Sequence, residues 1–131
     1  MHTVRLYYAI AGIVAALVHG DVLLSQSGPK KAVPDTSAIT EQMITEGRSV
    51  FRGHGGCTVC HGQNLEGVVG PTLKAHAWKD AKNGDIAEIV RVITQGVPGT
   101  VMVAHPNGVT DAQINAVAAY VWAVSRGKAK P

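Results

Sequence analysis

The chain has 131 residues, which is long enough for one domain with a modest core and too short for two. Twelve Lys and Arg oppose nine Asp and Glu, so the net charge at pH 7 is +3 with histidine neutral. The basic residues form no stripe with interleaved aromatic side chains, which argues against a nucleic-acid partner.

The first 24 residues predict an export segment. An early cation, Arg5, is followed by an uncharged apolar run from Leu6 to Val18, which has the length of a signal-peptide core and is short for a membrane span. Cleavage is the favoured interpretation, and an uncleaved membrane anchor over residues 6–24 is the alternative. A buried soluble helix is disfavoured because no polar face interrupts the run. Both the cleaved and the anchored form place the following domain in the periplasm or at the outer face of the inner membrane.

Three segments follow the export segment. Residues 25–37 are rich in Gly, Pro, Ser and Lys and lack apolar periodicity, so they predict a flexible linker. We expect the folded domain over residues 38–127 and a short tail over residues 128–131. No strand-like alternation of useful length occurs in the sequence, which predicts an all-α fold class.

Apolar spacing predicts two helices in the first part of the domain. One spans about residues 38–52 and stops at Gly53, with a partial apolar stripe formed by Ile39, Met43, Val50 and Phe51. The other spans about residues 85–95, with Asp85 as its expected N-cap and Gly96 as its end. Its expected buried face is formed by Ile86, Ile89, Val90 and Ile93.

A third helix has the clearest start. Thr110, Asp111, Ala112 and Gln113 form a capping box, and an apolar face follows at helical spacing, formed by Ile114, Val117, Ala118, Val121 and Trp122. This helix is expected to end near Arg126. By contrast, about thirty residues rich in Gly and Pro separate the first two helices, a length unusual inside a compact domain unless the segment wraps something other than protein.

This long gap contains the only two cysteines of the chain, Cys57 and Cys60, followed directly by His61. A redox dithiol usually follows a strand, and none is predicted here. A disulfide would close too small a loop to stabilise much, and a zinc site would lack the rest of its four ligands. In covalent haem attachment, both thiols bond to the vinyl groups of one porphyrin and the histidine binds the iron on one face. The motif therefore favours one covalently attached haem c.

A second axial ligand must reach the iron from the opposite face, so it should come from a distant segment. The favoured residue is Met102, in an irregular segment between the second and third helices. Met43 falls inside the first helix, and His54 is too close to the attachment motif to cross to the other face. His105, three residues after Met102, and His76 remain alternatives.

With these residues identified, the chain resembles the class I cytochromes c over roughly residues 39–125. The resemblance rests on Gly47 and Phe51 in the first helix, with Tyr120 of the last helix as their packing partner. A glycine at this position lets two helices cross closely. The resemblance implies the class I cytochrome c fold, in which three main helices surround one haem.

The family pattern Gly-Pro-x-Leu is present as Gly70-Pro71-Thr72-Leu73. It implies that the Pro71 carbonyl accepts a hydrogen bond from the ring N–H of His61, which makes the other ring nitrogen a better iron ligand. Trp78 falls where many relatives place an indole near a haem propionate. The sequence departs from the family after Met102, where Val103 replaces a frequent proline.

The resemblance implies an electron carrier rather than an enzyme. Iron with a histidine and a thioether ligand is coordinatively full, leaves no site for a small-molecule substrate and has a raised reduction potential. The expected partners are redox proteins that donate and accept single electrons. A dedicated haem subunit of a membrane-associated dehydrogenase or oxidase complex is the alternative function. A haem sensor or peroxidase-like enzyme is a further alternative if Met102 does not bind the iron.

Overall fold

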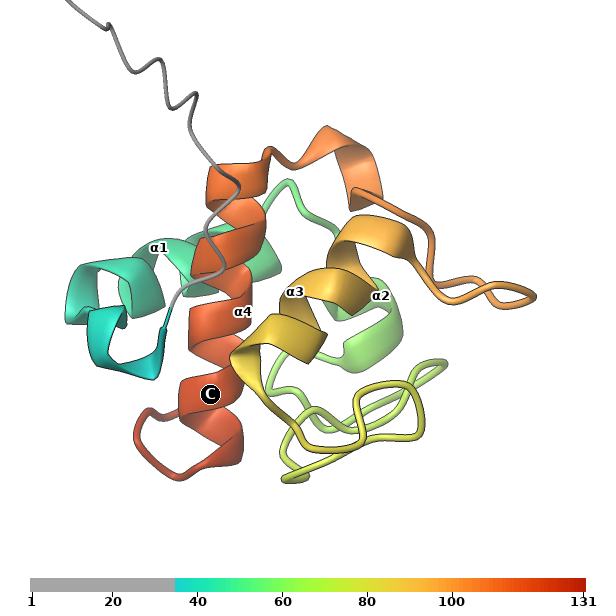
Figure 1. Cartoon of the computed structure of the whole chain (residues 1–131). Helices are drawn as coiled ribbons and strands as arrows, with labels where there is room; N and C mark the ends of the chain where they lie inside the picture. The colour runs from blue at the N-terminus through green and yellow to red at the C-terminus, as the bar shows by residue number, and fades with distance from the viewer. Residues whose placement is uncertain (1–34) are drawn as a thin grey trace, which may run out of the picture.

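The computed structural model describes residues 35–131. The segment predicted to direct export and the predicted linker up to residue 34 lie outside these described residues, so the structure does not bear on the predicted cleavage or anchor. Within residues 35–131 the elements are η1 (Thr36–Ala38), α1 (Glu41–Arg52), α2 (Thr58–His61), α3 (Ile86–Gln95), η2 (Pro106–Gly108) and α4 (Asp111–Ser125) (Figure 1). This part of the chain has no strand, which confirms the all-α prediction.

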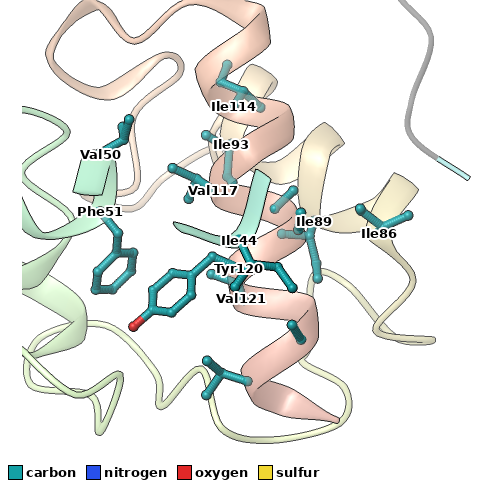
Figure 2. Close-up of a cluster of buried hydrophobic side chains, with 14 of the residues drawn as sticks. Ile44, Val50, Phe51, Ile86, Ile89, Ile93, Ile114, Val117, Tyr120 and Val121 are labelled. Atoms are coloured by element: carbon teal, nitrogen blue, oxygen red, sulfur yellow. The ribbon is translucent and has the colours of Figure 1, made fainter. Parts of the chain in front are cut away.

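The helix α4 is the centre of the fold, with α1 and α3 packed against it (Figure 1). At the crossing of α1 and α4, a Cβ added to Gly47 would overlap the carbonyl oxygen of Ala116 and lie 2.9 Å from the Cβ of Tyr120. The rings of Phe51 and Tyr120 meet edge to face, with centroids 5.7 Å apart and planes at 70° (Figure 2). The packing expected for Gly47, Phe51 and Tyr120 is therefore present.

The core lies where α1, α3 and α4 converge (Figure 2). The predicted buried faces are largely confirmed, since Ile86, Ile89 and Ile93 of α3 and most of α4 are buried. Ile39, Met43, Val90 and Trp122 lie partly buried at the margin of this core, and Ile44 takes the buried position in α1 that the stripe had missed. The helix also begins later than predicted, at Glu41, so Ile39 precedes it.

The helix starts show which capping predictions hold. Thr110 Oγ1 accepts from the Gln113 N–H at 3.3 Å while Gln113 Oε1 accepts from the Thr110 N–H at 2.9 Å, so the capping box of α4 is confirmed. Asp85 is the N-cap residue of α3, as predicted, but its side chain makes no capping hydrogen bond. The carboxylate of Glu88 instead accepts from the Asn83 N–H at 2.8 Å and closes the turn before the helix.

After α4 the chain folds back on the helix. The Lys128 N–H donates to the Ala123 carbonyl at 2.8 Å, and Arg48 Nη2 of α1 donates to the Lys130 carbonyl at 2.6 Å. The segment expected as a short tail therefore closes over the end of the α1–α4 pair. None of the helices in residues 35–131 combines the length and apolar character required to cross a bilayer.

Candidate functional site

One face of the α3–α4 pair forms the wall of a cavity of about 540 Å³. This volume falls within the range of ~300–1,000 Å³ typical of cofactor pockets. The wall is mostly apolar, and its helical part includes Ile89 and Ile93 of α3 and Val117 and Val121 of α4. The remaining lining comes from α2 and from the Gly- and Pro-rich loops, so the long gap between the predicted helices encloses this cavity.

The two cysteines line the cavity from the short helix α2 and the residue that precedes it. Their spacing of three residues places both side chains on one helical face. They form no disulfide with each other. Burial raises the pKa of the Cys57 thiol to about 11, so this group is neutral at pH 7. A neutral thiol is compatible with the apolar wall around it.

The imidazole of His61 lines the same cavity, and its Nδ1 lies 2.9 Å from the Pro71 carbonyl oxygen. This is the hydrogen bond that the family resemblance implied. Since a carbonyl can only accept, Nδ1 carries the proton and Nε2 keeps a free lone pair. A Cβ on Gly70 would lie 2.8 Å from the ring Cε1 of His61, so a side chain at this position would displace the imidazole.

Met102 also lines the cavity, from the loop between α3 and η2. Its N–H donates to Thr100 Oγ1 at 3.1 Å, and its carbonyl accepts from the Val97 N–H at 2.8 Å. Gly96 has a left-handed backbone (φ 69°), and a Cβ there would lie 2.6 Å from the Met102 carbonyl oxygen. The segment before Met102 is therefore a closed turn held by its own backbone and by one threonine.

The other four candidate axial ligands do not line the cavity. Met43 lies within α1 at the margin of the core, and His54 and His76 are exposed on loops. His105 turns to Asp111, with 3.2 Å between Nε2 and Oδ1. Met102 is thus the one candidate of the five whose side chain shares the cavity with His61.

Trp78 lines the cavity too, but its indole N–H donates to the Thr72 carbonyl at 2.7 Å. This N–H is therefore not free to donate to a haem propionate, which is the contact that the resemblance implied. It links Trp78 to the loop that carries Thr72 instead. Gly70, which the family pattern contains, lies against the ring of His61. Asn107 also lines the cavity, and nothing in the sequence pointed to it.

These residues fit a covalently attached haem. The cavity has the size and apolar wall that a porphyrin needs, two thiols lie one helical turn apart on its edge, and an imidazole nitrogen and a thioether sulfur line it. The class of protein that this fold and this site define is the class I c-type cytochrome.

The comparisons with known proteins agree. The family model described as cytochrome C oxidase, cbb3-type, subunit III matches residues 42–121, and the chain belongs to this family. Its cofactor is covalently bound haem c, and Cys57, Cys60 and His61 fit the attachment motif. The chain is therefore a haem c protein of the electron-carrier type. No curated protein matches the chain.

Three solved structures with a similar fold are cytochromes. The c-type cytochrome SorU from Sinorhizobium meliloti is 30% identical, with 70% of this chain and 100% of SorU covered and a TM-score of 0.53. Cytochrome c6 from the diatom Phaeodactylum tricornutum is 27% identical, with 65% and 97% covered and a TM-score of 0.53. Cytochrome CL from Methylophaga aminisulfidivorans is 26% identical, with 61% of this chain covered and a TM-score of 0.50. This chain spans 53% of the length of that cytochrome CL.

Proposed function

We propose that this protein is a single-haem c-type cytochrome that carries one electron at a time between redox proteins in the periplasm or at the outer face of the inner membrane. The observation that carries the proposal is that Cys57, Cys60, His61 and Met102 line one apolar cavity. The export segment predicted over residues 1–24 supports this location, because such a leader would direct the domain across the inner membrane.

Each of these residues has a distinct role in the proposal. The sulfurs of Cys57 and Cys60 would hold the haem through two thioether bonds, and His61 Nε2 and the Met102 sulfur would bind its iron. The Pro71 carbonyl holds the ring of His61 in the tautomer that leaves Nε2 free. The bound haem supplies one iron that alternates between the ferrous and ferric states. Two protein ligands exclude substrates from the metal, which supports a carrier rather than an enzyme.

The residues around the opening of the cavity favour a redox partner that binds through apolar contacts. Val59, Val69, Val101 and Val103 line the cavity and are 73%, 68%, 68% and 57% exposed. Residues 53–65 and 92–110 supply much of this rim and contain no Lys, Arg, Asp or Glu. A partner that docks here needs an uncharged, apolar face, because exposed large apolar groups around one opening favour hydrophobic association. Lys74, Lys79 and Lys82 are exposed, and they fit a solvated loop better than a docking surface for an acidic partner.

A second candidate function is a dedicated haem subunit of a membrane-associated oxidase or dehydrogenase complex. The description of the matching family as a subunit of cytochrome c oxidase favours it. Purification of the full-length chain from its own membranes distinguishes the two functions. A stable complex with a dehydrogenase or oxidase supports the subunit, and a free monohaem protein supports the carrier.

The direct test of the proposed site is carbon monoxide binding to the reduced protein at neutral pH, after maturation in a host that attaches haem c. We expect a low-spin absorption spectrum that carbon monoxide leaves unchanged, because both axial positions are filled. A rapid spectral change on addition of carbon monoxide would reveal an open axial position. That result would favour a sensor or a peroxidase-like enzyme over a carrier.

A further inference from the structure

The segment that follows Met102 contains a strained turn. Of the three non-glycine residues with a left-handed backbone in residues 35–131, two are His105 (φ 44°) and Asn107 (φ 51°), on either side of Pro106. Such residues persist only where their surroundings hold them, and they often mark functional segments. We name residues 105–108 the clasp turn.

The first strained residue ties the clasp turn to the helical framework. The His105 N–H donates to the Ile93 carbonyl of α3 at 3.0 Å, and its Nε2 lies 3.2 Å from Oδ1 of Asp111, the first residue of α4. The side chains of His105 and Asp111 are 38% and 47% exposed, so their contact adds little to global stability. The effect of the two His105 contacts is local, because they fix the position of the loop after Met102 relative to α3 and α4.

The second strained residue ties the clasp turn to the attachment segment. Asn107 Nδ2 donates to the His54 carbonyl at 3.1 Å, across 53 positions of sequence. A Cβ on Gly56, the residue before Cys57, would overlap Asn107 Nδ2, so only glycine permits this approach. Asn107 also lines the cavity. The side-chain amide of Asn107 therefore joins the segment that follows Met102 to the segment that precedes Cys57.

We infer that the clasp turn positions the sixth ligand, by holding the Met102 segment in a fixed place relative to the segment that bears Cys57. In this role His105 and Asn107 are positioning residues that act through Met102 and do not bind the iron themselves. The inference rests on the proposed ligation by Met102. Loosening the clasp turn then makes the sulfur easier to displace, without removing the haem or any ligand.

The test uses the holoprotein with single glycine substitutions. Asn107→Gly keeps a residue that tolerates the left-handed backbone and removes the amide that holds His54. His105→Gly does the same for the contact with Asp111 and serves as the second variant if the first fails to mature. The matched control is Asn64→Gly, an exposed asparagine that does not line the cavity.

The measurement is the affinity of the ferric protein for imidazole, which competes with the methionine sulfur for the iron, together with the reduction potential. We expect Asn107→Gly to bind imidazole about fivefold more tightly than the wild type, as the loss of one net hydrogen bond predicts. Its reduction potential should fall, because the thioether favours the ferrous state. Asn64→Gly should match the wild type in both quantities.

Two results overturn the inference, and they are distinguishable. If Met102→Ala binds imidazole strongly while Asn107→Gly and His105→Gly behave as Asn64→Gly does, Met102 is the ligand but the clasp turn does not position it. If Met102→Ala and the wild type bind imidazole equally, the sulfur does not ligate. The proposed axial ligand then fails together with the inference.

Discussion

Replacing Gly47 with alanine tests whether the close crossing of α1 and α4 determines the stability of the domain. A Cβ at this position would lie 2.5 Å from the carbonyl carbon of Ala116, whereas ordinary contacts begin near 3.4 Å. Because that atom belongs to the backbone of α4, no side-chain rotation can relieve the overlap. The carbonyl oxygen of Ala116 lies closer still, so the two helices must separate by at least about 0.9 Å.

The magnitude follows from two opposed terms. Alanine is a better helix former than glycine by ~1 kcal/mol, which alone would stabilise α1. Overpacking costs ~1–3 kcal/mol, and a gap approaching 1 Å forfeits between a quarter and half of each dispersion contact across the crossing. With the overpacking cost at its upper end, the net effect is a loss of about 2 kcal/mol in the free energy of unfolding.

Denaturant unfolding of the holoprotein measures this loss, since the midpoint falls with the free energy of unfolding. The control is Thr45→Ala, an exposed position on the same helix, where helix propensity alone should act and the free energy should change little or rise. A Gly47→Ala protein at least as stable as the Thr45→Ala protein would refute the steric argument.

Three further predictions concern substitutions of side chains in the site and the core. Replacing Cys57 and Cys60 together with alanine should abolish covalent haem, and haem that still resists acid-acetone extraction from this variant would contradict the attachment. Met102→Ala should lower the reduction potential and open the iron to carbon monoxide, whereas an unchanged spectrum and potential would exclude its sulfur as a ligand. Tyr120→Phe should leave the free energy of unfolding unchanged or raise it by up to ~1 kcal/mol, because the buried hydroxyl lacks a hydrogen-bond partner among the described residues. A clear loss of stability in thermal unfolding would instead indicate that the hydroxyl has a partner such as buried water.

The features that could be predicted from the sequence are those encoded by neighbouring residues. The capping box at Thr110 and the apolar spacing after it gave the start and the buried face of α4 correctly, because both depend on positions within one helix. The attachment motif likewise lies within five consecutive residues from Cys57 to His61. The family pattern added the hydrogen bond between His61 and Pro71.

The features that were missed depend on distant residues or on competition between neighbours. Asp85 has the right residue type for a cap, but Glu88 makes the hydrogen bond that closes the turn before α3. The helix α2 spans only Thr58–His61, too short to show a periodic pattern. The contact between Asn107 and His54 joins segments far apart in the sequence, so no local signal announces it.

The pairing of α1 with α4 also has a consequence for the order of events during biogenesis. The helix α4 ends at Ser125, and its Val117 and Val121 form part of the cavity wall. That wall cannot assemble until the last helix has been made and has docked on the first, a contact that closes a long loop. Before α4 docks, Cys57 and Cys60 therefore lack this part of the wall around them, and the completed fold leaves both thiols partly buried.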